Sequence, residues 1–147
     1  MKALALVVFL LSVLASPAIA QQTETIGYVR EMTGSAKIFR GADPLLAAVG
    51  VALHRGDLVR TDKPGAVGIV LLDDTTISLG SNSELSLNGY DFSPKEGKFS
   101  LVMRMLKGTF VYVSGQISKL APETIQLSIP DATIAIRGTK LLVEIQE

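Results

Sequence analysis

Apolar residues that alternate with polar ones constrain the fold of this chain most, because the pattern recurs along most of its length. It is present at residues 77–79, 85–87, 125–129 and 134–136, and a β-branched and aromatic run occupies residues 110–113. Successive side chains of a strand point to opposite faces, so each segment predicts a half-buried strand. Turn residues separate these segments at intervals of about 8–12 residues. We therefore expect one all-β domain of about ten short strands, arranged as a β-sandwich or a short β-solenoid roll.

Four other segments complete this prediction. Residues 67–72 are apolar at nearly every position, which predicts a strand covered on both faces, and residues 100–107 alternate well enough to predict another strand. Only residues 45–53 suggest a short helix, although a glycine within them disfavours it. Residues 88–97 form the longest polar interruption, which predicts a mobile loop that could carry function.

The N-terminus has the composition of a secretory signal peptide. Lys2 gives a positive start, residues 3–15 form a nearly uninterrupted apolar run, and Ala18 and Ala20 supply the small residues of a cleavage site. The apolar run is shorter than the about 20 residues that span a bilayer. We therefore expect cleavage after Ala20 and a mature domain of residues 21–147 in the periplasm or outside a bacterial cell.

Composition excludes several classes of protein. The chain contains no cysteine, which excludes disulfides and favours a bacterial envelope over a small eukaryotic secreted domain. Lys and Arg together number 14, as do Asp and Glu, so the net charge is near zero. A nucleic-acid partner would require a clustered basic surface, and we expect none.

Three sequence blocks follow one another in a recognisable order. The run GDLVRT at residues 56–61 is followed by LLDDTTISLG at residues 71–80 and by IAIRGT at residues 134–139. Together these blocks resemble the landmarks of the FecR domain, and the resemblance covers residues 26–143. It implies an extracytoplasmic all-β domain with no known enzymatic chemistry and no cofactor.

The resemblance also sets an expectation about signalling. In the iron-dicitrate sensing regulator for which the family is named, such a domain relays a signal from an outer-membrane receptor. That protein reaches a sigma factor through a membrane-spanning helix and a cytoplasmic segment. This chain shows neither part after signal cleavage, so we expect a free-standing periplasmic or secreted member without the transmembrane signalling parts.

Arg137 and Thr139 are the first candidate binding residues. A guanidinium presents two parallel donors to a carboxylate or phosphate, so an exposed Arg137 could recognise either group. The alternative is structural. In that case Arg137 pairs with a nearby acid, Gly138 allows a bend and Thr139 bonds to the backbone.

The second set of candidates lies in and beside the expected loop. Tyr90 and Phe92 alternate and share a face, where they either stack on a sugar or anchor the loop to the core. Lys95 and Lys98 make this stretch locally basic. They either meet anionic cell-wall or lipopolysaccharide groups or lie on a solvated face.

Other motifs carry weaker hypotheses. Arg-Gly-Asp at residues 55–57 spells a cell-adhesion tripeptide, but Gly-Asp is also ordinary turn chemistry. Asp73 and Asp74 at a hairpin tip predict a solvated turn rather than a cation site, because calcium takes about six to eight oxygen ligands. His54 is the only histidine, so we expect neither a metal site nor a catalytic triad.

Together these patterns predict a protein that is not an enzyme. The first hypothesis is a recognition module that binds an envelope protein or a cell-wall polymer. One alternative is a structural or assembly component that adds its edge strand to a partner sheet. The other alternative is a β-roll that carries lipid in an apolar groove.

Overall fold

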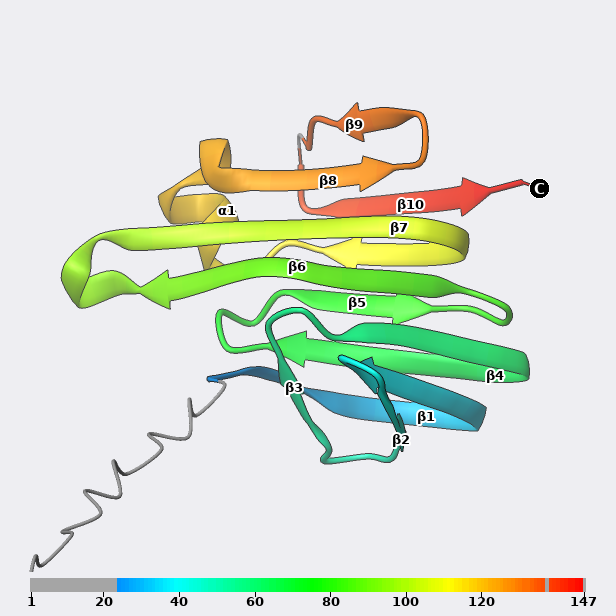
Figure 1. Cartoon of the computed structure of the whole chain (residues 1–147). Helices are drawn as coiled ribbons and strands as arrows, with labels where there is room; N and C mark the ends of the chain where they lie inside the picture. Colours follow the sequence, from blue (N-terminus) through cyan, green and yellow to red (C-terminus); the bar gives the residue numbers. More distant parts are fainter. Residues whose placement is uncertain (1–23, 137, 147) are drawn as a thin grey trace, which may run out of the picture.

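The structure, a computed structural model, describes residues 24–136 and 138–146, so the expected signal peptide and Arg137 lie outside the described residues. Ten strands form one hydrogen-bonded sheet, which confirms the all-β prediction (Figure 1). The strands are β1 (Thr25–Arg40), β2 (Asp43–Leu46), β3 (Ala52–His54), β4 (Leu58–Leu71), β5 (Thr76–Leu79), β6 (Glu84–Ser93), β7 (Lys98–Val113), β8 (Ile125–Ile129), β9 (Ala132–Ile134) and β10 (Lys140–Ile145). The helices are η1 (Pro94–Glu96), α1 (Gln116–Leu120) and η2 (Pro122–Thr124).

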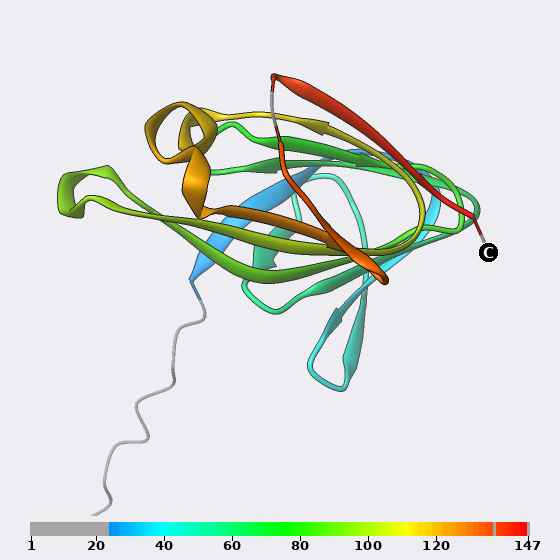
Figure 2. The same cartoon turned by 90° about the horizontal axis from the view of Figure 1, so that it is seen from above.

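The sheet folds over into two layers because its long strands β1, β4 and β7 bend in the middle. Residues 98–107 of β7 pair with β6, whereas residues 110–113 pair with β5. The same change of partner occurs along β4, which pairs with β6 before its bend and with β5 after it. Figure 2 shows the two layers joined by these bends on the right and the β6–β7 hairpin projecting on the left.

Each layer is therefore built from halves of long strands together with short strands. The first layer contains the first half of β1, the second halves of β4 and β7, β5 and β10. The second layer contains β2, the second half of β1, the first halves of β4 and β7, β6, β8 and β9. Among the strands of the described residues, only β7 and β8 pair in parallel, and α1 lies in the connection between them.

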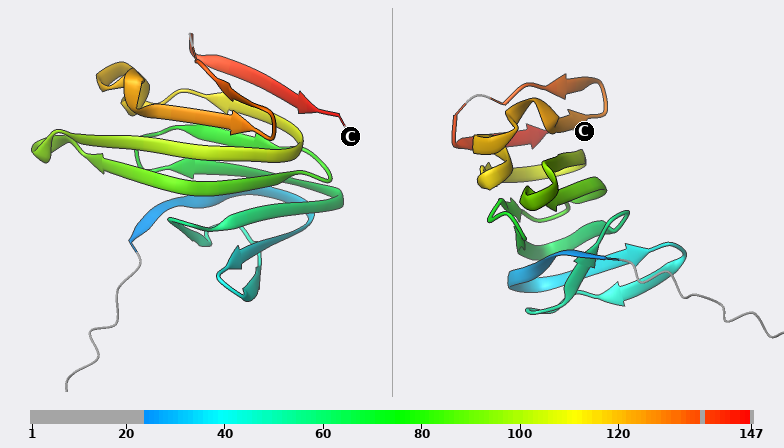
Figure 3. Two further views of the ribbon diagram at one scale, coloured as in Figure 1. Left: turned by 45° about the horizontal axis from the view of Figure 1, so that its top comes forward. Right: turned by 90° about the vertical axis from the view of Figure 1, so that its left-hand side faces the viewer.

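The two ends of the stack differ (Figure 3). At one end, β2 and β3 pair with opposite halves of β1 and cover parts of its outer edge. At the other end, β10 pairs only with β7 and β9 pairs only with β8 within the described part of the chain. Within the described residues both ends therefore have edge strands, β2 and β3 at the first end and β9 and β10 at the second.

Close approach of the backbone at the bends explains one of the glycines. Gly108 has φ of 96°, a conformation that side-chain-bearing residues rarely adopt, and a Cβ there would clash with Ser83. The Ser83 hydroxyl instead accepts a hydrogen bond from the Thr109 N–H over 3.0 Å. Glycine at this position therefore lets the bend of β7 sit against the connection between β5 and β6.

The space between the layers is filled by side chains. Inward-facing residues of both layers are fully buried, and they include Leu53, Ile77, Met103, Phe110 and Tyr112. These side chains occupy the position that an acyl chain would need in a lipid-carrying roll. The interior therefore gives no support to the lipid alternative.

The predicted helix at residues 45–53 is wrong. This segment contains the end of β2, a connection and the start of β3. The Gly50 N–H donates to the Val29 carbonyl over 2.8 Å, and the Val29 N–H donates to the Val51 carbonyl over 3.0 Å. Pairing with the edge of β1 therefore overrides the local helical preference.

The structure also corrects the prediction for residues 88–97 and the one for residues 67–72. β6 continues through residue 93 and is followed directly by η1, so the expected loop is a paired hairpin, with one irregularity in its register between Leu87 and Gly89. Residues 67–71 of β4 alternate between buried and partly exposed positions, so this strand is not covered on both faces. Gly68 and Val70 lie on its outer side, which is half-buried.

Candidate functional site

The β6–β7 hairpin projects beyond the roll and carries four of the candidate binding residues. We call residues 92–99 the β6–β7 tip. Phe92 and Phe99 lie opposite one another in the register, with ring centroids 6.1 Å apart and planes inclined by 52°. Gly97 ends the turn, and its N–H donates to the Pro94 carbonyl over 3.2 Å. The tip is therefore a paired hairpin held by an aromatic contact.

The charges of the β6–β7 tip are mixed. Lys95 and Lys98 are both exposed, as predicted for a surface that meets a partner or solvent. Lys98 forms an exposed ion pair with Glu96 at 3.4 Å. Exposed pairs of this kind contribute little to stability, but the pair reduces the local excess of positive charge.

Tyr90 lies in the core rather than on the exposed face of the hairpin, with only 4% of its surface exposed. Its hydroxyl donates to Asp73 Oδ1 over 2.9 Å and accepts from the Asp73 N–H over 2.8 Å. Burial, followed by the charge of Asp73, raises the pKa of Tyr90 above its usual value. Tyr90 thus anchors the base of the hairpin to the β4–β5 turn.

Asp73 is wholly buried, so the prediction of a solvated turn is wrong for this residue. Its carboxylate accepts from the Thr75 hydroxyl over 2.7 Å and from the Ile117 N–H over 3.1 Å, in addition to Tyr90. Of the two aspartates at this turn, only Asp74 faces solvent. One buried carboxylate therefore joins β6, the β4–β5 turn and the start of α1.

A second buried tyrosine lies beside this network. Burial, followed by the charge of Asp73, raises the pKa of Tyr112 to about 12. Within the described residues its hydroxyl finds no hydrogen-bond partner. Both tyrosines thus lie in buried surroundings near Asp73, but only the Tyr90 hydroxyl is bonded to its carboxylate.

The Arg and Asp side chains of the Arg-Gly-Asp tripeptide both form hydrogen bonds within the domain. Asp57 is fully buried and pairs in a bidentate manner with Arg40, at 3.0 and 2.8 Å. Asp57 also accepts from the His54 N–H over 2.8 Å. The hydrogen bond to Asp57 raises the pKa of Arg40. A carboxylate in this position is not available to an adhesion receptor.

Arg55 contributes to a hollow that the sequence did not reveal. Its guanidinium donates to the Tyr90 carbonyl over 2.6 Å, a contact across 35 positions of sequence. The hollow has a volume of about 240 Å³ and is lined by Arg55, Gly89, Tyr90, Asp91 and Ser100. We call it the basal hollow, because it lies at the base of the β6–β7 hairpin. It places the guanidinium of Arg55 and the carboxylate of Asp91 beside Gly89, which has no side chain.

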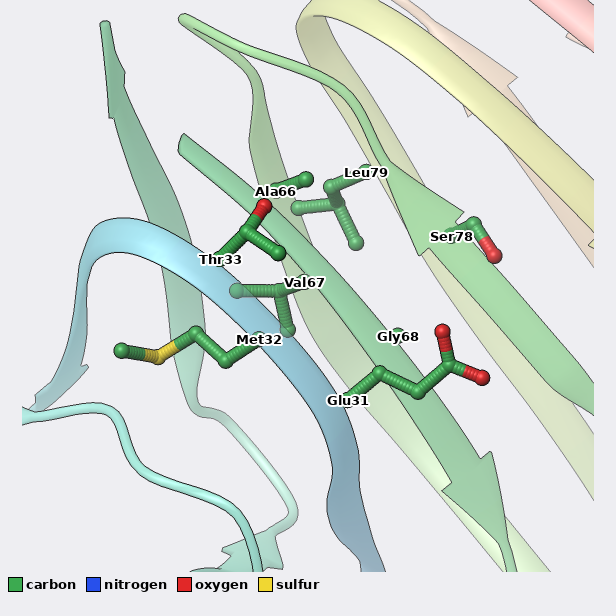
Figure 4. A pocket seen from close by; sticks show the side chains of 8 residues that line it. All are labelled: Glu31, Met32, Thr33, Ala66, Val67, Gly68, Ser78 and Leu79. Atoms are coloured by element: carbon green, nitrogen blue, oxygen red, sulfur yellow. The ribbon is translucent and has the colours of Figure 1, made fainter. Parts of the chain in front are cut away.

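A smaller hollow of about 110 Å³ lies on the outer face of the first layer. Figure 4 shows the Glu31 side chain extending across Gly68 of β4 toward Ser78 of β5. Glu31 is largely exposed, with 76% of its side chain accessible. Both this hollow and the basal hollow are below the size of a small-molecule pocket, about 300–1,000 Å³, so neither is assigned to a small molecule.

Thr139 lies apart from the hairpin in the chain, directly before β10. Its carbonyl accepts from the Ser114 N–H over 2.8 Å and from the Ser114 hydroxyl over 3.1 Å, while its side chain is exposed. The structure therefore brings Tyr90, Phe92, Lys95 and Lys98 onto one hairpin but does not join Thr139 to them. Arg137 cannot be placed, because it is outside the described residues.

No group of three or more His, Cys, Asp or Glu side chains is arranged to hold a metal ion in residues 24–136 and 138–146. No helix in the part of the chain that the structure describes is long and apolar enough to cross a membrane.

Comparison with known proteins gives one result. The model of the family described as FecR protein matches residues 57–147, which is more than half of the chain. The match begins at the buried Asp57, and it includes the first sequence block except Gly56 and the whole of the other two. No curated protein and no solved structure gives a significant match.

Proposed function

This chain belongs to the FecR family, and from that premise we propose that it is an exported, non-catalytic recognition module that binds a protein of the bacterial envelope. In this proposal the signal peptide is removed after Ala20, and the domain of residues 21–147 acts in the periplasm or outside the cell. The β6–β7 tip and the basal hollow form the recognition surface. A cell-wall polymer is the less favoured ligand.

Asp57 and Asp73, the buried aspartates of the first two sequence blocks, make contacts that stabilise the fold. This observation supports a non-catalytic role. Asp57 is neutralised by Arg40, and Asp73 is surrounded by the donors of Tyr90, Thr75 and Ile117. Each carboxylate is fully buried. Their role is to fix turns, because a buried carboxylate is tolerated only where a cation or several hydrogen-bond donors satisfy its oxygens.

One observation carries the choice of surface: the hairpin projects from the roll and is held rigidly at its base. Tyr90 is bonded to Asp73 and Arg55 is bonded to the Tyr90 carbonyl, so the strand is anchored through both a side chain and its backbone. Beyond this anchor, Phe92 and Phe99 remain half-buried and Lys95 is exposed. A preorganised aromatic and basic projection loses little conformational freedom on binding.

The charge of this surface favours a protein over an anionic polymer. Lys98 is paired with Glu96, and Asp91 lies in the basal hollow beside Arg55. Both signs of charge are therefore presented within one surface. Mixed charges with aromatic residues suit a protein interface, whereas an anionic polymer would favour a surface of one sign.

A site-specific crosslink tests this proposal. A photo-crosslinking residue in place of Lys95 is expected to capture one envelope protein in the native host, while the same residue in place of Lys37 captures none. Lys37 is an exposed lysine on β1 and serves as the matched control. Equal capture from both positions would count against the β6–β7 tip as the recognition surface.

Reconstitution then measures the contribution of the charges. The captured protein is purified and titrated with the wild-type chain and with the double variant Lys95→Glu, Lys98→Glu. We expect the double variant to bind at least about tenfold more weakly, with an unchanged unfolding midpoint. Unchanged affinity would show that the tip does not contact the partner. Binding of purified cell-wall polymer in place of a protein would overturn the choice of ligand.

Thr139 and Arg137 stay candidate binding residues of a second surface in this proposal. The Thr139 side chain is exposed while its carbonyl is held by Ser114. Thr139→Ala is therefore expected to change any binding at this surface without unfolding the domain. A loss of stability with unchanged binding would assign the residue to the fold.

A further inference from the structure

The outer edge of β10 is unpaired along the strand within the described residues. The Ser114 N–H donates to the Thr139 carbonyl, which sets the alternation of backbone groups in the β7–β10 ladder. In an antiparallel pair, backbone groups of successive residues point alternately to the two sides of the strand. Lys140, Leu142 and Glu144 therefore present their N–H and C=O groups to the free edge.

Side chains of β10 alternate between the core and the outer face. Val143 is buried, and Leu141 and Ile145 are partly buried against the core. Lys140, Leu142 and Glu144 point outward, and Leu142 is 68% exposed. The residues that offer free backbone groups are thus the same three that form the exposed face.

From these two alternations we propose that β10 pairs antiparallel with β10 of a second copy of this chain, about a twofold axis at Leu142. This register brings Lys140 opposite the partner's Glu144, and Leu142 opposite the partner's Leu142. On the inner side, Leu141 lies opposite the partner's Val143. The resulting first layer is a continuous sheet through both copies, and the inference does not depend on the proposed function.

Charge complementarity favours this register, and it favours a second copy of the chain as the partner of β10. Two β10 strands can form hydrogen bonds only where residues whose N–H and C=O groups face the free edge lie opposite one another. Any alternative register of the two strands is therefore shifted by two residues. Such a shift places Lys140 opposite the partner's Leu142 and removes its charge pair. Opposite charges on facing strand positions stabilise a pair, whereas like charges destabilise it. Lys140 and Glu144 are equally spaced from Leu142, so the edge is complementary to itself.

The neighbouring side chains also fit a second copy. Leu142 lies beside Val111 of β7 in the ladder, so self-pairing continues an apolar row from one copy into the other. Charged residues commonly protect edge strands from pairing. Here the two charges have opposite sign and neutralise each other across the twofold axis. The other edge strand at this end, β9, has only three residues and offers a shorter ladder.

Charge reversal tests the proposal. Sedimentation of the purified protein is expected to show a concentration-dependent dimer, and Lys140→Glu or Glu144→Lys alone is expected to weaken it by at least about tenfold. Mixing the two single variants creates complementary edges and should restore a heterodimer. Lys37→Glu, on the second layer, is the control and should leave the dimer unchanged. A monomeric wild type, or a mixture that stays monomeric, would overturn the proposal.

A cysteine scan tests the register independently, because the native chain contains no cysteine. Facing residues in a hydrogen-bonded antiparallel pair have Cα atoms about 5.5 Å apart, within the range of a disulfide. Leu142→Cys should therefore form a disulfide-linked dimer under mild oxidation. In the Glu144→Cys variant, the cysteine of one copy would be offset by four strand positions, more than about 13 Å, from the cysteine of the other copy. These two cysteines should not crosslink. Equal crosslinking of both variants would contradict the register.

Discussion

Tyr90 and Asp73 are joined by two hydrogen bonds at the base of the β6–β7 hairpin, one from the tyrosine hydroxyl to Oδ1 and one from the aspartate N–H to the hydroxyl. The pair connects β6 to the β4–β5 turn across 17 positions of sequence. Since Asp73 also accepts from the Ile117 N–H, the same carboxylate fixes the start of α1. The orientation of the projecting hairpin therefore depends on a buried side chain far from its tip.

Replacing Asp73 should destabilise the domain strongly. Asp73→Ala leaves the Tyr90 hydroxyl, the Thr75 hydroxyl and the Ile117 N–H without their acceptor, and each unsatisfied buried donor costs about 1–3 kcal/mol. We expect a loss of at least about 3 kcal/mol in the free energy of unfolding, measured with urea. Asp74→Asn, at the exposed neighbouring position, should change it by less than about 0.5 kcal/mol. Similar effects of the two substitutions would contradict this assignment.

The two buried tyrosines should respond differently to loss of the hydroxyl. Tyr90→Phe removes both hydrogen bonds to Asp73 and is expected to cost about 1–3 kcal/mol. Tyr112→Phe removes a hydroxyl that has no partner among the described residues, and should be neutral or slightly stabilising. Urea unfolding of both variants provides the measurement. A larger cost for Tyr112→Phe would show that its hydroxyl is bonded.

Alkaline pH should destabilise the domain. The pKa of Tyr112 is raised to about 12 and that of Tyr90 is also raised, whereas tyrosines of the unfolded chain titrate near pH 10. Above about pH 10 the unfolded state therefore binds fewer protons than the folded state, so stability is complete below that pH and declines toward pH 12.

We expect the free energy of unfolding to fall by on the order of 1–2 kcal/mol between pH 9.5 and pH 11. Urea unfolding at these pH values, with the tyrosinate absorbance as a second signal, measures the change. The double variant Tyr90→Phe, Tyr112→Phe should lose most of this dependence. A wild-type stability that is constant over this interval would contradict the assigned shifts.

A side chain at the bend of β7 should be poorly tolerated. Gly108→Ala combines a positive φ with a clash against Ser83, and we expect it to cost more than about 2 kcal/mol. Gly97→Ala is the matched control, because Gly97 also has positive φ but a Cβ there meets nothing within 4 Å. It should cost only about 1–2 kcal/mol. Thermal or urea unfolding compares the pair, and equal costs would exclude the clash as a cause.

The fold was largely predictable because burial of one strand face leaves a clear trace in sequence. Alternation predicted β5, β8 and the first half of β7, and the expected total of about ten strands is confirmed, although β1, β4 and β7 run through positions where turns or separate short strands were expected. The helix proposed at residues 45–53 failed because its backbone pairs with β1, a distant partner that local preference cannot reveal. The regular structure of residues 88–93 was missed because cross-strand pairing with β7 outweighs their polar composition.

The candidate site was less predictable, since it depends on contacts distant in sequence. The local sequence predicts that Asp73 is a solvated turn residue, whereas in the fold its carboxylate is bonded to Tyr90 and Ile117. Nothing in the sequence joins Arg55 to the carbonyl of Tyr90, 35 positions away. Lys95 and Lys98 could be anticipated as surface groups because lysine is mostly exposed in folded proteins, whichever element carries it.

Three strands that pass through both layers make the domain difficult to open in part. β1, β4 and β7 each pair with different strands in the two layers. Loss of pairing in one layer therefore destabilises the pairing of the same strands in the other layer. Amide hydrogens of the two layers should therefore exchange with solvent through a common global opening rather than through separate ones. For the exported domain that we propose, this means that a protease would rarely meet a half-open form.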